Sequence, residues 1–313
     1  MARLLAHGLV ALALTLLSAC AVSRAGDDGA PVPSRAPGTL RLASFNVHFI
    51  RRDRETGPWS RADWQLRKLR LDAAVKALDA DIIGFQEMAS LPEQDSPNLA
   101  LEWLDARNPD YGVAASGRQA GFPSGQAVFY RKDRLRVIDE GWLPCDTPES
   151  GAGAGTDQAP PVFRPRPRSE MGWDYVCVWV RFATRDGRQF QLFNVHFHYR
   201  NYRLQRVAAR AVTARVAPLL AAGTPVIVLG DTNALSGWRS VEILRRAGLS
   251  IREAAGASYH FNVGLHLYGA IDRIALSPGI ALVSGPQLVT RRFHGGWPSD
   301  HYPLVADIRL PEV

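Results

Sequence analysis

The sequence predicts an α/β fold of four layers (α-β-β-α), in which two packed, mostly antiparallel sheets carry helices on their outer faces. Apolar strands are followed by amphipathic helices twice along the chain, and several neighbouring strands are separated only by turns, which favours antiparallel pairing. At 313 residues, with 46% hydrophobic residues, the chain can bury a large core in one domain. We place this domain at residues 39–313.

The first residues are typical of an export signal. A basic start leads into an apolar stretch at residues 9–17 that is too short to span a bilayer comfortably. The string Leu17-Ser18-Ala19-Cys20 resembles the bacterial lipoprotein signal, so we expect removal of residues 1–19 and lipidation of Cys20. A plain secretory signal, with Cys20 incidental, is the alternative.

A flexible tether is expected at residues 20–38, which are rich in Gly, Pro, Ser and Ala. Ala21, rather than an aspartate, follows the cysteine, and the lipoprotein resemblance then favours the outer membrane, with the domain facing the periplasm. No later stretch is long and apolar enough to span a membrane. Export would expose Cys145 and Cys177 to an oxidising compartment, so a disulfide between them is a hypothesis that sequence alone leaves open.

The first half of the domain alternates strands and helices. An apolar strand at 40–49 precedes a helix at 62–79, in which Trp64 and Leu71 recur at helical spacing. A short buried strand at 81–87 then ends in a carboxylate. The next elements are a helix at 99–107 and strands at 113–116, 127–131 and 135–140.

The second half opens on a pair of strands at 175–182 and 190–198, joined by a turn that contains Asp186-Gly187. Before them, residues 146–170 are rich in Gly, Ala, Pro and Arg without periodicity, which predicts a long loop of the functional or mobile kind. The remaining elements are helices at 203–220 and 240–247 and strands at 225–229, 268–275 and 305–310.

Polar side chains recur where the apolar runs stop. A carboxylate or imidazole at a strand end can reach a cleft and still be held in place by the sheet. Mg²⁺ prefers oxygen ligands and needs only one or two carboxylates, so we predict a metal site with Glu87 as the main ligand and Asn46 and Asp300 in support. The residues in such positions are Asn46, Glu87, His196, Asp231, Asn233, Asp272, Asp300 and His301.

Asp272 lies inside an apolar strand, where an unpaired charge is costly. His301 is the suggested partner, because an imidazole oriented by an aspartate is the usual arrangement for a general base that acts on water. A salt bridge from Asp272 to a nearby arginine is the structural alternative.

Six short sequence motifs, which occur in the order typical of the family, resemble those of the endonuclease/exonuclease/phosphatase family. This family has the metal-dependent fold of DNase I-like nucleases, inositol-phosphate phosphatases and bacterial sphingomyelinases. Each string alone is weak, but together they span residues 40–310. They are Ser44-Phe45-Asn46-Val47, Gly84-Phe85-Gln86-Glu87, Asn194-Val195-His196-Phe197, Leu229-Gly230-Asp231-Thr232-Asn233-Ala234, Ile271-Asp272-Arg273-Ile274 and Ser299-Asp300-His301-Tyr302-Pro303.

The resemblance implies in-line attack of water on a phosphate ester, with Mg²⁺ as cofactor and Mn²⁺ or Ca²⁺ as alternatives. It implies that His301 and Asp272 activate the water. Asp231 and Asn233 would hold the phosphoryl oxygens or the nucleophile, and His196 would stabilise the pentacovalent state or assist the leaving oxygen.

A substrate-binding cluster is expected beside His196, at His198, Tyr199, Arg200 and Asn201, where aromatic and basic side chains could stack a base and clamp a phosphate. A loop whose side chains face water is the alternative. The net charge of +7, carried almost entirely by arginine, suits a phosphate-bearing partner, although solvated surface charge explains it equally well.

The sequence therefore predicts a membrane-tethered, monomeric, metal-dependent hydrolase of phosphate esters, and within that class a phosphodiesterase or nuclease. The alternatives are a phosphomonoesterase, a lipid-headgroup phosphodiesterase of the sphingomyelinase kind, and a non-catalytic lipoprotein that binds anions. No run of basic residues is dense enough to form a nucleic-acid-binding tail.

Overall fold

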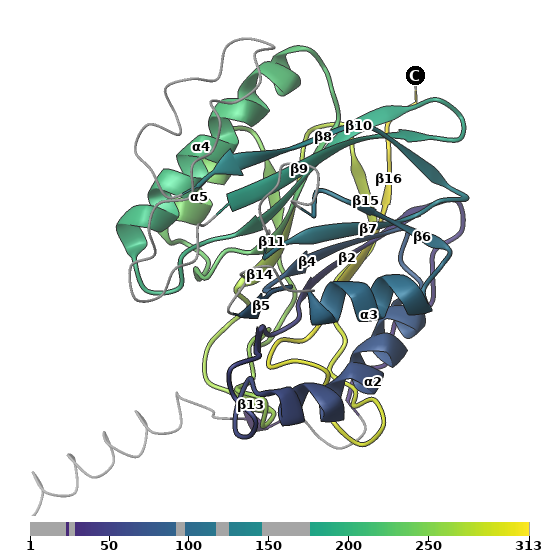
Figure 1. Ribbon diagram of the computed structural model, residues 1–313. Helices are drawn as coiled ribbons and strands as arrows, with labels where there is room; N and C mark the ends of the chain where they lie inside the picture. The colour runs from purple at the N-terminus through teal and green to yellow at the C-terminus, as the bar shows by residue number, and fades with distance from the viewer. Residues whose placement is uncertain (1–22, 25–28, 92–97, 117–124, 146–175, 313) are drawn as a thin grey trace, which may run out of the picture.

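The computed structural model describes residues 23–24, 29–91, 98–116, 125–145 and 176–312. Two six-stranded sheets pack face to face, and helices cover both outer faces (Figure 1). This arrangement confirms the predicted four-layer α/β fold.

Each sheet combines strands from both halves of the chain. The first has the order β15-β16-β2-β4-β7-β6 and the second the order β12-β14-β11-β10-β9-β8. The first comprises β2 (Leu40–Asn46), β4 (Ile82–Gln86), β6 (Tyr111–Ala114), β7 (Ala127–Arg131), β15 (Ala281–Leu288) and β16 (Leu304–Arg309). The second comprises β8 (Leu135–Pro144), β9 (Val176–Thr184), β10 (Gln189–His196), β11 (Val226–Asp231), β12 (Ser250–Arg252) and β14 (Asp272–Leu276). Two small sheets pair β1 (Ser23–Arg24) with β13 (Leu265–His266) and β3 (Ile50–Arg51) with β5 (Ser90–Leu91).

One parallel pair lies inside each large sheet, and these pairs position the polar strand ends. β2 runs parallel to β4, so Asn46 lies opposite Gln86. β10 runs parallel to β11, so His196 lies opposite Asp231. β14 is antiparallel to β11 and begins with Asp272 opposite Asp231. The carboxyl ends of the parallel strands and the start of β14 therefore meet at one edge of the sandwich.

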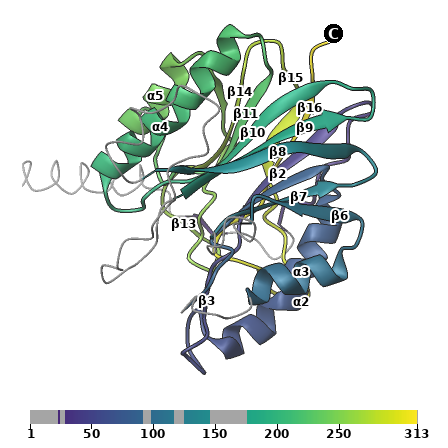
Figure 2. The same cartoon turned by 45° about the horizontal axis from the view of Figure 1, so that its top comes forward.

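The helices form the outer layers, as Figure 2 shows from a second direction. α2 and α3 cover the first sheet, whereas α4 and α5 cover the second. Side chains cap the starts of three of them: Ser60 accepts from Asp63 N–H, Asn98 begins α3 and Asn201 begins α4. The bounds are α2 (Arg61–Leu78), α3 (Leu99–Arg107), α4 (Tyr202–Ala221) and α5 (Arg239–Arg246).

Three apolar clusters fill the spaces between the four layers. Leu42 and Ile227 belong to the cluster between the two sheets. Phe85 packs with Leu71 of α2 between the first sheet and its helices, and Val212 of α4 packs against the second sheet. Successive residues of a strand point to opposite faces, so each central strand contributes to two clusters and is buried along its length.

Residues 29–39, which directly precede β2, lie against the domain. The Ala30 N–H donates to Thr290 Oγ1 at 2.6 Å, and the Ala36 N–H donates to Asp307 Oδ2 at 2.8 Å. The Arg35 guanidinium contacts the buried Asp81 carboxylate at 3.1 Å. The final part of the segment assigned to the tether is thus bound to the domain surface.

Several predictions fall outside the described residues: the signal segment 1–19, the lipidated Cys20 and the loop 146–170. Within the described ranges, no helix is both long and apolar enough to cross a membrane.

A disulfide joins Cys145 to Cys177, with the two Cα atoms 6.0 Å apart. Cys145 directly follows β8 and Cys177 lies in β9, the strand paired with β8. Both residues are buried against α4. The disulfide therefore links the end of β8 covalently to its neighbour β9 within the second sheet.

Two strands differ from the sequence prediction. β15 was not predicted, because its alternate residues are exposed and it contains Gly285-Pro286; it is an edge strand, where proline is tolerated. The strand predicted at 268–275 begins only at Asp272, because its partner β11 ends at Asp231 and no ladder continues beyond that pair.

Candidate active site

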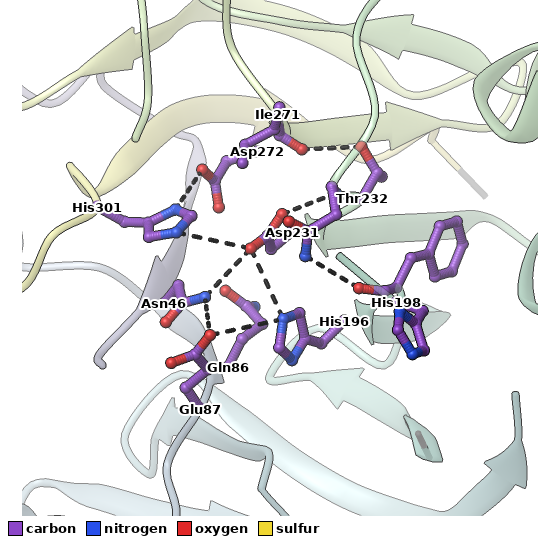
Figure 3. A network of polar contacts seen from close by, with 12 residues as sticks. Asn46, Gln86, Glu87, His196, His198, Asp231, Thr232, Ile271, Asp272 and His301 are labelled. Carbon is purple, nitrogen blue, oxygen red and sulfur yellow. Dashed lines mark hydrogen bonds and ion pairs between the residues drawn. The ribbon is translucent and has the colours of Figure 1, made fainter. Parts of the chain in front are cut away.

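The polar residues at the strand ends converge on the carboxylate of Asp231 (Figure 3). Asp231 Oδ2 accepts a hydrogen bond from Asn46 Nδ2 at 3.1 Å. It also lies 3.7 Å from Nε2 of His196 and 3.7 Å from Nε2 of His301. Both sheets therefore contribute to one site, with Asp231 at its centre.

Asp231 is almost fully buried, and its second oxygen accepts the backbone N–H of Asn233 at 2.8 Å. Burial and the neighbouring Asp272 raise the pKa of Asp231 to about 6, against the opposing effect of His301 and His196. Two carboxylates so close together in the interior favour a nearby positive charge.

His301 and Asp272 form a buried pair, with 2.9 Å between His301 Nδ1 and Asp272 Oδ2. Burial disfavours the imidazolium, but Asp272 and Asp231 outweigh it and raise the pKa of His301 to about 10. Ser258 Oγ holds the start of β14 by accepting the Asp272 N–H at 3.2 Å. The pair thereby fixes the ring so that Nε2 points toward Asp231 (Figure 3).

Glu87 follows β4 and reaches the same site from the first sheet. Its Oε1 lies 3.2 Å from Asn46 Nδ2 and 3.8 Å from His196 Nε2. Its Oε2 accepts the Phe49 N–H at 3.4 Å. The backbone of Glu87 has a φ of 54°, which is uncommon outside glycine; this sharp turn brings the half-exposed carboxylate to the strand ends.

Asn46 orients the acidic groups around it. Its amide nitrogen donates to both Glu87 and Asp231, and its amide oxygen accepts the His48 N–H at 3.1 Å. Asn46 thus connects the carboxylates of the two sheets.

Asp300 lies in an ion pair with His48, which the sequence analysis had not singled out. His48 Nδ1 is 2.9 Å from Asp300 Oδ2, and Ser299 Oγ is 3.3 Å from Asp300 Oδ1. Burial opposes ionisation of Asp300, but His48 outweighs it and holds the pKa of that carboxyl well below its usual range. If Asp300 binds a metal, its carboxylate would therefore do so while it is paired with His48.

Asn233 contributes mainly through its backbone in this structure. Its N–H orients Asp231, while its side-chain Nδ2 donates to the Phe197 carbonyl at 2.9 Å. The residue has a φ of 46°, so the turn after β11 is sharp. The side-chain Nδ2 carries a second hydrogen, and this N–H is the group of Asn233 that can donate to a phosphoryl oxygen.

The residues of the expected substrate-binding cluster lie at the start of α4. His198 Nδ1 accepts the N–H groups of Arg200 and Asn201 at 3.2 and 3.1 Å, and Asn201 caps the helix. The His198 ring stacks on Tyr199, and the Arg200 guanidinium lies over the Tyr199 ring. In Figure 3 the His198 ring lies beyond His196, apart from the residues around Asp231.

The sequence profile described as the Endonuclease/Exonuclease/phosphatase family matches residues 43–301, which include every residue around Asp231 described above. The chain belongs to the endonuclease/exonuclease/phosphatase family. It is thereby placed among hydrolases that include phosphatases and nucleases. No curated protein matches the chain in sequence.

Solved structures of this family share the fold. An endonuclease/exonuclease/phosphatase from Bacteroides vulgatus aligns with a TM-score of 0.64 at 22% identity, over 87% of this chain and 99% of its own. A mannosyl-6-phosphatase from Bacteroides thetaiotaomicron aligns with a TM-score of 0.61 at 21% identity, over 87% and 100%. TDP2 from D. rerio, complexed with a single-strand DNA product, aligns with a TM-score of 0.62 at 15% identity, over 87% and 99%. At sequence identities of 15% to 22%, these alignments show that the fold is shared and do not show a shared substrate.

Enzymes of this family generally depend on a divalent metal, and the donor set here suits one. Ligand atoms of Asp231, Asp272 and His301 lie within 4.8 Å of one another. Asp272 Oδ1 is buried and receives no hydrogen bond from the described residues. Together with Glu87, the carboxylate oxygens of Asp231 and Asp272 fit a hard cation such as Mg²⁺ or Mn²⁺, whereas the His301 ring is held by its contact with Asp272.

Sequence reasoning missed His48 and Ser258. His48 carries a weak signal, since it stands two residues after Asn46, but nothing in the sequence links it to Asp300. Ser258 lies in a segment without periodicity, and its hydroxyl accepts the N–H groups of Ile271 and Asp272.

Proposed function

We propose that the protein is a Mg²⁺-dependent phosphodiesterase that acts on nucleic acid or nucleotides, with a water activated by His301 and Asp272 as the nucleophile. One observation carries the proposal. A buried imidazole–carboxylate pair faces Glu87 and Asn46 across the central carboxylate of Asp231, in a family of phosphoesterases.

His301 is the group that takes the proton. Its Nδ1 is held by Asp272, so Nε2 is the free position from which it can accept a proton from water. A bound divalent cation would polarise a phosphoryl oxygen and, by offsetting the charge of Asp231, favour the neutral form of His301.

Asp231 and His196 act beside the attacked phosphorus. Asp231, oriented by Asn46 and by the Asn233 N–H, directs the water, and the second N–H of Asn233 Nδ2 donates to a phosphoryl oxygen. His196 lies between Glu87 and Asp231, where its imidazole N–H stabilises the charge that develops on the phosphoryl and leaving oxygens.

Turnover of three substrates, with and without Mg²⁺, tests the proposal: plasmid DNA, a chromogenic phosphodiester and a chromogenic phosphomonoester. We expect metal-stimulated cleavage of the diesters. His301→Ala and Glu87→Gln should each lower it at least about 100-fold, whereas the exposed His294→Ala and Glu102→Gln should not change it.

Undiminished turnover in both His301→Ala and Glu87→Gln would defeat the assignment of the site. Metal-stimulated turnover of the monoester alone would instead make the enzyme a phosphomonoesterase.

We also propose that the protein is an outer-membrane lipoprotein anchored through Cys20, with a monomeric domain facing the periplasm. The support is the string Leu17-Ser18-Ala19-Cys20 after a short apolar stretch. Labelled palmitate should be incorporated by the protein in a bacterial host and not by Cys20→Ala. Equal labelling of the two would remove the anchor from the proposal.

A further inference from the structure

A group of nearly parallel aromatic rings lies beside the Glu87 end of the site. The rings of His48, Phe49 and Trp59 have centroids 5.6 to 5.9 Å apart in each pairing. The planes of Phe49 and Trp59 differ by only 6°. His48 is buried, whereas Phe49 and Trp59 are half-buried and reach the surface. We call Phe49 and Trp59 the aromatic platform.

The platform is fixed to the residues that surround the proposed metal position. The Phe49 N–H donates to Glu87 Oε2 at 3.4 Å. The His48 N–H donates to Asn46 Oδ1 at 3.1 Å, and the His48 ring, on which Trp59 stacks, pairs with Asp300. The two rings therefore keep a defined place relative to the site.

The backbone at two of the three rings is in a conformation that non-glycine residues seldom adopt. His48 has a φ of 58° and Trp59 a φ of 62°. If these positions served only to turn the chain, glycine or asparagine would adopt this backbone conformation at a lower cost in free energy. Strained positions that keep large side chains gather at functional sites, and here they keep an imidazole and an indole beside the site.

In-line attack decides which part of the substrate would meet the platform. In the proposed mechanism the water attacks from the side of His301, so the leaving oxygen would depart on the opposite side of the phosphorus. Glu87 and His301 lie at opposite ends of the contacts that run through Asn46 and Asp231 (Figure 3). The leaving alcohol is therefore on the Glu87 side, next to Phe49.

We propose that the aromatic platform of Phe49 and Trp59 stacks a planar ring of the leaving group, and that the substrates are phosphodiesters whose leaving alcohol carries a nucleobase. This inference rests on the proposed phosphodiesterase function. Stacking of a base on an aromatic side chain tolerates any base, so the platform selects for the presence of a base and against an alkyl alcohol.

The test uses a deoxydinucleotide and its doubly abasic tetrahydrofuran analogue, which share the scissile phosphodiester and differ in the bases. We expect kcat/KM of the wild type to favour the base-bearing compound about tenfold or more. This ratio should fall close to one in Trp59→Leu and be largely kept in Trp59→Phe. Trp103→Leu, which alters a half-buried tryptophan of α3 outside the site, should keep the wild-type ratio.

Two analogues that each lack one of the two bases then show which base stacks on the platform. The preference should follow the base on the nucleoside that leaves. Tyr268 lies on the His301 side, because its ring stacks on Tyr259, whose ring is 5.0 Å from that of His301. A preference that follows the other base would overturn the proposal, and so would a ratio that is lost in Tyr268→Leu but kept in Trp59→Leu. A wild-type kcat/KM that is nearly equal for the two dinucleotides would also overturn the proposal. The same holds if Trp59→Leu lowers kcat/KM for both dinucleotides by the same factor.

A binding experiment separates this inference from the proposed function. If the wild type cleaves neither dinucleotide, the phosphodiesterase assignment fails. The platform is then tested by calorimetric titration of AMP and of ribose 5-phosphate. Tighter binding of AMP that is lost in Trp59→Leu supports the platform, and equal binding of the two ligands by the wild type refutes it.

Discussion

Gln86 and Asn194 join the two sheets through their side chains, since Gln86 Nε2 donates to Asn194 Oδ1 at 2.6 Å across the interior. Asn194 Nδ2 donates in return to the Phe85 carbonyl at 2.8 Å. Both side chains are fully buried. Glu87 directly follows Gln86, and His196 lies two residues after Asn194. This link therefore sets the distance between site residues that belong to different sheets.

Replacing Asn194 with alanine should weaken both the fold and the site. The change leaves the Phe85 carbonyl without its 2.8 Å donor in a buried place, so we expect the free energy of unfolding to fall by about 2–4 kcal/mol. Urea denaturation measures this loss. Gln189→Ala, at the exposed start of the same strand, should change it by less than about 0.5 kcal/mol. Equal losses in the two variants would show that the link is not important for stability.

Replacing Asp272 with asparagine should lower kcat while the protein stays folded. Asparagine has nearly the same shape, but it cannot stabilise the imidazolium that forms when His301 takes a proton. We expect kcat to fall by about 10²–10⁴ with little change in KM. Steady-state kinetics on a phosphodiester measure the fall, with the exposed Asp110→Asn as the matched control. A variant with wild-type kcat would reduce Asp272 to a structural residue.

The site residues at strand ends could be predicted from the sequence because each follows, or begins, an apolar run. Glu87, His196 and Asp231 stand where β4, β10 and β11 stop, and parallel pairing within each sheet brings such ends to one edge. The four layers could be predicted for a related reason, since the central strands β2, β4 and β11 are mostly apolar and buried along their length, and therefore need cover on both faces.

The ion pair of His48 and Asp300 could not be predicted in this way. Both residues lie in loops, and the left-handed backbone of His48 that directs its ring is not encoded by any periodicity. The edge strand β15 was missed because half of its residues face solvent and give no apolar run. The pattern of apolar and polar residues therefore predicts side chains that are positioned by strand ends. It does not predict contacts between residues of two loops.

The disulfide between Cys145 and Cys177 should stabilise the second sheet. It closes a loop between residues with a sequence separation of 32, for which the chain-entropy estimate is about 3–4 kcal/mol. The double variant Cys145→Ser/Cys177→Ser should therefore unfold at lower urea concentration than the wild type under oxidising conditions. After reduction of both proteins, the difference should largely disappear.

Thiol titration gives an independent check of the same disulfide. Denatured wild type without reductant should show no reactive thiol from these two cysteines. Two reactive thiols, apart from any at Cys20, would mean that the disulfide does not form in the protein.

In the absence of a divalent cation, the stability that His301 contributes should depend on pH. Its pKa is raised in the folded protein to about 10, from an ordinary value of 6.5, because Asp272 and Asp231 outweigh burial. A raised imidazole pKa stabilises the fold fully below the ordinary value, and the contribution is lost as the pH rises through about 10. In EDTA, wild type should therefore exceed His301→Gln by about 2–5 kcal/mol at pH 6, and this advantage should shrink steadily toward pH 10.

Urea unfolding of both proteins at pH 6, 8 and 10 measures this trend. Asp231 has its pKa raised to about 6, so its own titration is nearly complete at pH 8, and the change between pH 8 and 10 reports His301. An advantage that stays constant from pH 6 to 10 would mean that His301 is not held as an imidazolium by the two carboxylates. In that case its interaction with Asp272 would be an ordinary neutral hydrogen bond, and a bound cation would not be needed to release the proton before catalysis.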